Sequence, residues 1–349
     1  MSVVLRVPAA GWRAHQRRVL AATPGLVPVA KGNGYGFGLA RLASEAAALG
    51  VDTLAVGTPA EVAAVRDAFG GRIVVLQPWR PGEPGAAELL ADQRVIHTVS
   101  RVADLEHLST SGRRPSVLIE LLTSMRGHGM EVGELTDVRR VLGADGVDVI
   151  GWTVHLPMPA ATGGNAAEAE RLAKAGLAVR TLPTWFSHLT GSDYDRLRAT
   201  LFTGTRLRIG TELWLGGSVS RRTTATVLDV HKVKRGEKVG YWQRAMPVDG
   251  FIVVVSGGTA HGIALEAPTS AATTRQRVIS AVNGSVEALG WARSPFTIGG
   301  KKRWFVEPPH MQASMVFVPG SKGIPAIGDQ VPVELRLTTA TVDEVVLED

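Results

Sequence analysis

Lys31 is the first residue of the chain whose surroundings favour reaction rather than simple solvation. An apolar run typical of a buried strand, residues 26–30, precedes it, and alternate glycines from Gly32 to Gly38 follow it. A lysine that is partly desolvated at a strand end has a lowered pKa and becomes a candidate amine for a Schiff base. The glycines allow the backbone to approach an anion closely. Spacing alone fits a strand that ends in a flexible loop with a solvated lysine at least as well.

The same segment does not fit the common phosphate and metal motifs. In the dinucleotide fingerprint G-x-G-x-x-G the third glycine would be residue 37, which is Phe37. The sequence also lacks G-x-x-x-x-G-K and H-E-x-x-H. Cysteine is absent from the 349 residues, so disulfides, thiol nucleophiles and cysteine-bearing metal sites are excluded. Any chemistry must use other groups.

Charge and hydropathy leave a small-molecule enzyme as the expected class. Lysine and arginine number 38 against 32 acidic residues, a formal net charge of +6 that permits an anionic ligand. The basic residues are dispersed, which indicates a solvated surface rather than a nucleic-acid partner. The sequence shows no secretory leader pattern and no apolar run of the roughly 18 to 20 residues that cross a membrane. We therefore expect a cytoplasmic enzyme without membrane or nucleic-acid partners.

The sequence divides into two regions that differ in their pattern of predicted secondary structure. Short apolar runs alternate with alanine-rich stretches of helical spacing, as expected of consecutive βα units. The eight strand-like runs are residues 26–30, 53–56, 73–76, 95–99, 117–121, 149–154, 182–186 and 207–209. This pattern predicts a (β/α)8 TIM-type barrel over residues 8–216, with Lys31 at the functional mouth. Periodicity alone also allows an open doubly wound sheet.

The remainder, residues 217–349, reads as a mainly β domain. Its strand-like runs are separated by glycine, proline and charged turns: residues 222–230, 250–255, 277–282, 315–318 and 331–337. The strand-like residues 1–7 are a candidate to pair with this domain, which would make it discontinuous.

The segment K-G-N-G-Y-G-F-G, residues 31–38, resembles the K-A-N-A-Y-G-H-G signature of the alanine racemase family. Members of that family use pyridoxal phosphate (PLP) on a barrel with an appended β domain. Further segments are similar to family motifs in the same order through nearly the whole chain: residues 120–129, 152–155, 208–211, 236–241, 257–262 and 309–318. Each match alone is weak, but their order supports the resemblance.

The resemblance implies a PLP site at the barrel mouth. Lys31 would carry the cofactor, and Arg208 would face its pyridine nitrogen. Ser187 and His188 both lie where the family places a phosphate-binding serine, and the register between them stays open. The positions implied for the phosphate are Tyr35, Ser187, Gly210 and Thr211.

Racemisation needs two acid/base groups, one on each face of a planar carbanion. The resemblance implies that Lys31 serves one face and Tyr241 the other, with Tyr241 supplied by the partner subunit of a homodimer. A tyrosine can act in this way if neighbouring positive charge brings its pKa, about 10 when unperturbed, closer to neutrality. His155 and Arg208 would join the same polar network, and Arg126 and Met311 would lie near the substrate.

The sequence departs from the family pattern mainly on the substrate side. Glu120 stands where many members have a carbamylated lysine. Arg126 lies one position before the place of the family's arginine, which Gly127 occupies here. No tyrosine remains near the C-terminus for a further phosphate contact. The other departures are Thr259, His261 and Gln312.

These residues favour a PLP-dependent racemase that acts on alanine or a related small α-amino acid. Two alternatives remain open: another PLP-dependent reaction, such as decarboxylation, aldol cleavage or epimerisation, and a non-catalytic PLP-binding protein. Outside the family context, His155 would be a structural histidine at a strand end, Arg208 an ordinary ion-pairing arginine and Tyr241 an edge-strand aromatic.

Overall fold

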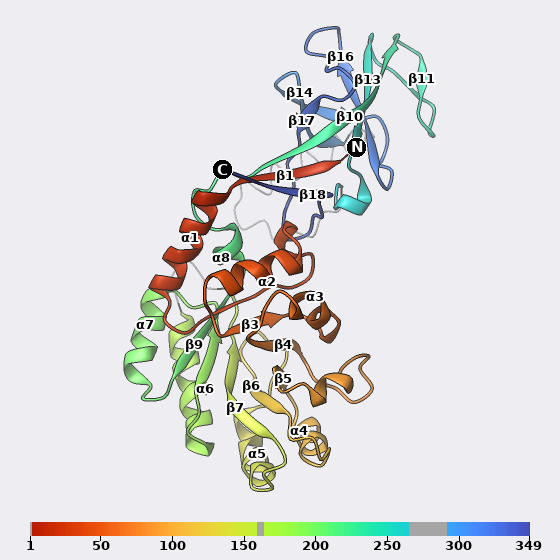
Figure 1. The fold of residues 1–349 in the computed structure, drawn as a ribbon. Coiled ribbons are helices and arrows are strands. Elements are labelled where there is room, and N and C mark those ends of the chain that lie inside the picture. The colour runs from red at the N-terminus through yellow and green to blue at the C-terminus, as the bar shows by residue number, and fades with distance from the viewer. Residues whose placement is uncertain (1, 159–163, 265–291) are drawn as a thin grey trace. The chain divides into compact units, whose positions relative to one another are not determined.

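A computed structural model describes residues 2–158, 164–264 and 292–349 (Figure 1). The chain forms two compact units: Gly11–Gly217 is one, and Met1–Ala10 together with Ser218–Asp349 is the other. The strand-like run 277–282 lies outside the described residues. Among the described helices, none combines the length and apolar character that crossing a bilayer requires.

The first unit is the predicted (β/α)8 barrel. Its strands are β2 (Leu26–Pro28), β3 (Thr53–Val56), β4 (Arg72–Pro78), β5 (Val95–Val99), β6 (Ser116–Leu121), β7 (Asp148–His155), β8 (Thr184–Ser187) and β9 (Thr205–Ile209). All pair in parallel in the order β2-β9-β8-β7-β6-β5-β4-β3. The Ala30 N–H donates to the Ala55 carbonyl at 2.8 Å, and Val29 bridges Ala55, so the two ends of the sheet meet. The open-sheet alternative is wrong.

Helices pack around the outside of this barrel (Figure 1). They are α1 (Ala9–Ala22), α2 (Leu39–Ala48), α3 (Val62–Arg66), α4 (Val102–Ser109), α5 (Leu135–Leu142), α6 (Asn165–Val179), α7 (Gly191–Thr200) and α8 (Thr211–Leu215). Outward residues such as Ile119 share an apolar cluster with Val138 of α5 and Leu172 of α6. Burial of this layer against the sheet is the main apolar stabilisation of the unit.

The interior of the barrel is a second apolar cluster, which includes Val27, Ala55, Ile96, Leu118 and Trp185. Because side chains alternate across a strand, the inward positions recur every second residue. The last inward side chains of β7, β8 and β9 therefore lie together at the carboxyl end of the barrel, where the candidate site is.

The second unit is mainly β, as predicted. Its described strands are β1 (Val3–Pro8), β10 (Arg222–Val233), β11 (Lys238–Val239), β12 (Arg244–Ala245), β13 (Gly250–Ser256), β14 (Arg293–Ile298), β15 (Lys301–Phe305), β16 (Ala313–Pro319), β17 (Gln330–Pro332) and β18 (Glu344–Glu348). The main sheet has the order β14-β15-β16-β13-β10-β1-β18, with β17 on β10, and β11 pairs β12 separately. The predicted strand 331–337 is wrong in its extent, because regular pairing in this region is confined to Gln330–Pro332.

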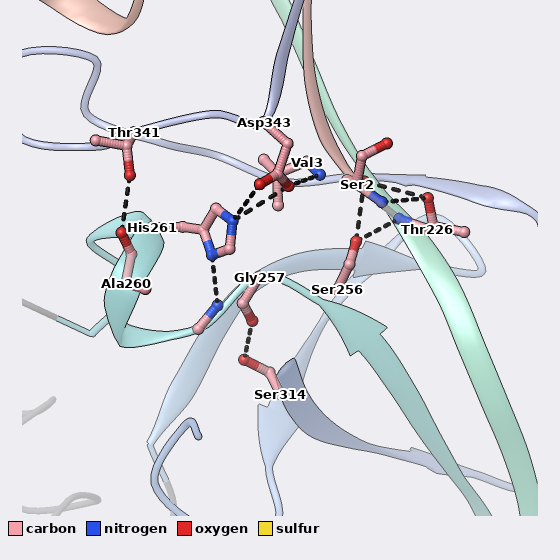
Figure 2. A network of polar contacts seen from close by, with 11 residues as sticks. Ser2, Val3, Thr226, Ser256, Gly257, Ala260, His261, Ser314, Thr341 and Asp343 are labelled. Atoms are coloured by element: carbon pink, nitrogen blue, oxygen red, sulfur yellow. Dashed lines mark hydrogen bonds and ion pairs between the residues drawn. The ribbon is translucent and has the colours of Figure 1, made fainter. Parts of the chain in front are cut away.

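Strand β1 lies inside this sheet, antiparallel to β10 and parallel to β18. Figure 2 shows the polar contacts at the start of β1. The carboxylate of Asp343 accepts the Val3 N–H at 2.7 Å and lies 3.2 Å from Nε2 of His261. Nδ1 of His261 accepts the Gly258 N–H at 3.3 Å, so Nε2 carries the proton and donates to Asp343. Asp343 therefore joins the turn that contains His261 to the start of β1.

Replacing His261 with alanine should lower the free energy of unfolding by about 1–3 kcal/mol, because the change leaves the buried Gly258 N–H without a partner and removes one contact of Asp343. Chemical denaturation at neutral pH measures this loss. His231→Ala is the control, since His231 is solvent-exposed and its contact with Asp229 is an ordinary surface pair. Equal effects of the two substitutions would show that the His261 contacts add no stability.

Candidate active site

Lys31 lies three residues after the end of β2, at the carboxyl end of the barrel, and its side chain is exposed there. Glu61 holds the backbone on both sides of the lysine pocket: Oε1 accepts the Gly32 N–H at 2.9 Å and Oε2 accepts the Gly57 N–H at 2.7 Å. A Cβ on Gly57 would lie 3.1 Å from Cβ of Lys31 and 3.0 Å from Oε2 of Glu61. Glycine at position 57 therefore gives the lysine side chain its room.

Aromatic packing anchors the segment that contains Lys31. Trp214 donates from its indole N–H to the Val29 carbonyl at 2.8 Å, two residues before the lysine. Beyond the lysine, the Phe37 ring stacks on Trp12 with 4.4 Å between centroids. The Trp12 indole in turn donates to the Trp214 carbonyl at 2.9 Å. The segment 31–36 is thus a loop between two fixed points.

Tyr35 lies within this loop, in the 3-10 turn Gly34–Gly36, with a left-handed backbone (φ 55°) and a buried side chain. An ideal Cβ on Gly210 would stand 2.0 Å from the Tyr35 hydroxyl, so only glycine allows this approach. Burial raises the pKa of Tyr35, and a hydrogen bond with Thr211 offsets part of the rise. The structure therefore brings Tyr35, Gly210 and Thr211 together where α8 begins.

His155, Ser187 and Arg208 occupy matching positions on three adjacent strands. His155 is the register partner of Ser187, and Ser187 is the partner of Arg208. Arg208 is in turn the partner of Val27, which belongs to the interior cluster, so all three side chains face the barrel interior. Nδ1 of His155 lies 2.7 Å from the Ser187 hydroxyl, and its ring meets that of His188 edge-on at 5.2 Å.

The positive groups at this mouth act on one another. Burial lowers the pKa of His155 to about 4, and the charges of Arg208, His188 and Lys31 act in the same direction. The pKa of His188 is lowered too, by burial and then by Arg208 and Lys31. Both imidazoles are therefore neutral at pH 7, and the remaining positive charge on Lys31 and Arg208 favours an anionic ligand.

Arg208 and Glu120 are a buried pair of opposite charge in the same mouth. Burial lowers the pKa of Arg208, and the charge of Glu120 opposes this. Burial raises the pKa of Glu120 to about 7, against the influence of Arg208 and Arg80. Nε of Arg208 and Oε2 of Glu120 are both buried without a hydrogen-bond partner among the described residues. Each of these two atoms therefore keeps an unused capacity for a hydrogen bond.

Glu120 should make the stability of the cofactor-free protein depend on pH. Its pKa is raised on folding, from 4.5 to about 7, so the folded state binds this proton more tightly than the unfolded state does. Its contribution is complete below about pH 4.5 and is lost as the pH rises through about 7, a change of up to about 3 kcal/mol. Chemical denaturation between pH 4.5 and 8 should therefore show a steeper decline for wild type than for Glu120→Gln.

The control for this comparison is Glu106→Gln, which alters a partly exposed carboxylate paired with Arg140. In Glu106→Gln, the free energy of unfolding should depend on pH as steeply as in wild type. Parallel curves for wild type and Glu120→Gln would contradict the buried-carboxyl assignment.

The other three residues predicted for the site are not part of this row of side chains, and their roles there stay predictions. Arg126 has a left-handed backbone (φ 55°) and an exposed side chain that pairs with Glu131 at 3.5 Å. Tyr241 and Met311 belong to the β unit, and both side chains are exposed there.

Comparison with known proteins agrees with this architecture. Residues 9–216 match the family model described as alanine racemase, N-terminal domain, which is more than half of the chain. The chain belongs to the alanine racemase family. No curated protein sequence matches it.

Solved alanine racemases share the fold across nearly the whole chain. The enzyme from Bartonella henselae, described with covalently bound pyridoxal phosphate, is 18% identical with a TM-score of 0.72, over 96% of this chain and 90% of that one. The enzyme from Clostridium difficile 630 is 15% identical with a TM-score of 0.68, over 95% and 87%. That from D-cycloserine-producing Streptomyces lavendulae is 19% identical with a TM-score of 0.66, over 95% and 87%. At these identities the likeness shows a common fold.

In this member of the alanine racemase family, Glu61 is a site residue that the sequence did not reveal. It stands in the turn Pro59–Glu61, 30 positions from Lys31, and no motif includes it. Its role depends on the adjacency of β2 and β3, which only closure of the barrel produces. The departure at Glu120, by contrast, was visible as an acidic residue inside an otherwise apolar strand.

Proposed function

We propose that this chain is a PLP-dependent amino-acid racemase, acting on alanine or a related small α-amino acid. The observation that carries the proposal is the barrel mouth itself, where Lys31 follows β2 beside an inward row of His155, Ser187 and Arg208. The family membership and the bound cofactor named for the Bartonella henselae enzyme support it. A cytoplasmic location and a homodimer belong to the same proposal.

The residues at the mouth of the barrel offer the functional groups that PLP requires. PLP has an aldehyde, a ring nitrogen and a phosphate, and so requires an amine, a donor to the ring and donors to an anion. Lys31 supplies the amine, and the unpartnered Nε–H of Arg208 suits the ring nitrogen. Tyr35, Gly210 and Thr211 lie together as phosphate donors, and Gly210 leaves the backbone open where a Cβ would collide with Tyr35.

Two groups of the chain would move the Cα proton. PLP, when bound, supplies an electron sink that weakens the Cα–H bond of the attached amino acid. Nζ of Lys31 accepts or returns the proton on one face, and Oη of Tyr241 does so on the other. A guanidinium keeps its proton, so Arg208 donates a hydrogen bond to the ring nitrogen without protonating it. An unprotonated ring nitrogen disfavours reactions other than proton transfer.

His155 contributes as a neutral group in this scheme. With a pKa of about 4 it carries no charge at pH 7, and its ring holds Ser187 at 2.7 Å. The pair can orient a phosphate donor without adding a further cation beside Lys31. Tyr241, in the proposed homodimer, would be supplied by a second copy of the chain, with Met311 near the substrate.

The test uses purified protein reconstituted with PLP and single L- or D-amino acids in deuterated water. Exchange at Cα with inversion supports the racemase. Loss of carbon dioxide or of the side chain would replace it with another PLP-dependent reaction. Failure to retain PLP after reconstitution and gel filtration would exclude both.

A further inference from the structure

Glu307 is a buried carboxylate in the β unit that binds two groups at once. Oε2 accepts the backbone N–H of Tyr241 at 2.6 Å, and Oε1 lies 2.8 Å from Nε2 of His310. Its side chain is 4% exposed, whereas that of His310 is 37% exposed. One carboxylate thus joins the Tyr241 backbone to a histidine ring.

The backbone around Glu307 is shaped for this contact. Gly240 has a left-handed φ of 77°, and a Cβ there would lie 2.3 Å from Oε2 of Glu307. Only glycine lets the carboxylate reach the Tyr241 N–H. Between Glu307 and His310 stand Pro308 and Pro309, whose rings fix φ and limit the freedom of the connection.

The ring of His310 packs on that of Tyr241, with 5.0 Å between centroids and 42° between planes. The His310 backbone is itself held, because its N–H donates to Ala313 at 2.9 Å and its carbonyl accepts from Thr259 at 2.9 Å. Tyr241 is 83% exposed, so few other contacts restrict its side chain. The ring of His310 is therefore held in place, and it is the main contact that restricts the Tyr241 side chain.

We propose that His310, held by Glu307, is a positioning residue that fixes the ring of Tyr241 and so sets where its phenolic oxygen exchanges a proton. The inference rests on the proposed function, in which Tyr241 serves one face of the substrate. A misplacement of a reacting group by about 1 Å can cost about 10²-fold in rate. Loss of the His310 ring should therefore impair proton transfer by Tyr241 and leave proton transfer by Lys31 unaffected.

The first measurement needs neither cofactor nor substrate. The chain contains three tyrosines, of which Tyr35 and Tyr194 are buried, so fluorotyrosine labelling gives few ¹⁹F signals, and Tyr241→Phe assigns one of them. In His310→Ala the Tyr241 signal should shift and narrow, because the adjacent ring is gone and the phenol moves freely. His231→Ala, at an exposed histidine of β10, should leave the Tyr241 signal unchanged.

The second measurement uses the PLP-reconstituted protein in deuterated water. For the enantiomer whose proton Lys31 removes, exchange without inversion should persist in His310→Ala, while inversion falls about 10- to 100-fold. Glu307→Gln keeps an oxygen that accepts the Tyr241 N–H and offers an amide N–H to His310, whose other tautomer accepts it. This variant should retain the wild-type ratio of exchange to inversion within about threefold. Glu307→Ala should raise that ratio as His310→Ala does.

An unchanged Tyr241 signal in His310→Ala, or an unchanged ratio of exchange to inversion, would overturn the positioning role. If wild-type protein binds PLP but neither exchanges nor inverts any amino acid, the proposed function fails, and the catalytic part of this inference fails with it. The ¹⁹F comparison then still decides whether His310 holds the ring.

Discussion

Lys31→Ala is expected to eliminate the visible absorbance that a lysine-linked cofactor gives the reconstituted protein, and to lower racemisation and Cα exchange by about 10³-fold or more. The substitution removes both the amine that would hold PLP and the proton acceptor on one face. Absorbance after gel filtration and deuterium exchange at Cα measure the two losses separately. Because the Lys31 side chain is exposed, stability should change little.

Lys174→Ala is the matched control. Lys174 is an exposed lysine of α6 that pairs with Glu170 at 2.7 Å, so its removal tests the general effect of losing one surface lysine. Absorbance and activity should match wild type. Retention of the lysine-linked absorbance in Lys31→Ala would move the attachment point to another lysine.

Tyr241→Phe is expected to separate exchange from inversion. Loss of the phenolic hydroxyl removes the acid/base group from one face, so inversion should fall by about 10²- to 10⁴-fold in both directions. Exchange without inversion should remain for the enantiomer whose proton Lys31 removes. Mass spectrometry combined with chiral chromatography of the recovered amino acid measures both quantities in one sample.

The neighbouring Trp242 provides the control, since it too is an exposed aromatic of the β unit. Trp242→Phe should change neither rate by more than about threefold if the effect belongs to the hydroxyl of Tyr241. Wild-type inversion in Tyr241→Phe would show that another group serves that face.

The strands of the barrel could be predicted from sequence, whereas helices α1 and α7 lack the regular apolar spacing that would predict them. Each of the eight predicted runs coincides with a barrel strand, because a strand buried on both faces is a short continuous apolar run. Helix α1 buries His15 and Gln16 beside Trp12, so polar residues interrupt its apolar period. Helix α7 is largely polar, and depends on the buried Tyr194, whose hydroxyl lies 2.7 Å from the Pro24 carbonyl.

The residues of the site were predicted where they belong to strand ends or to the glycine-rich loop. Lys31, Tyr35, His155, Ser187 and Arg208 are all at the mouth of the barrel, because chain direction alone places strand ends there.

The supporting contacts were not predicted. Glu61 and Glu307 act through bonds to backbone N–H groups, and these bonds depend on loop geometry that no residue pattern encodes. The surface contact of Arg126 with Glu131 was not predicted either, and the place of Arg126 near the substrate stays a prediction.

The pairing of β1 with β18 has a consequence for biosynthesis. Val3 and Asp343 bond to each other across 340 positions, with the whole barrel encoded between them. At about 5–20 residues per second, a ribosome takes roughly 20 to 70 s to deliver the last partner of the first strand. During that interval β1 lacks the strand that pairs with one of its edges. The nascent chain therefore has an unpaired strand edge until β18 is made, and such an edge is open to incorrect pairing.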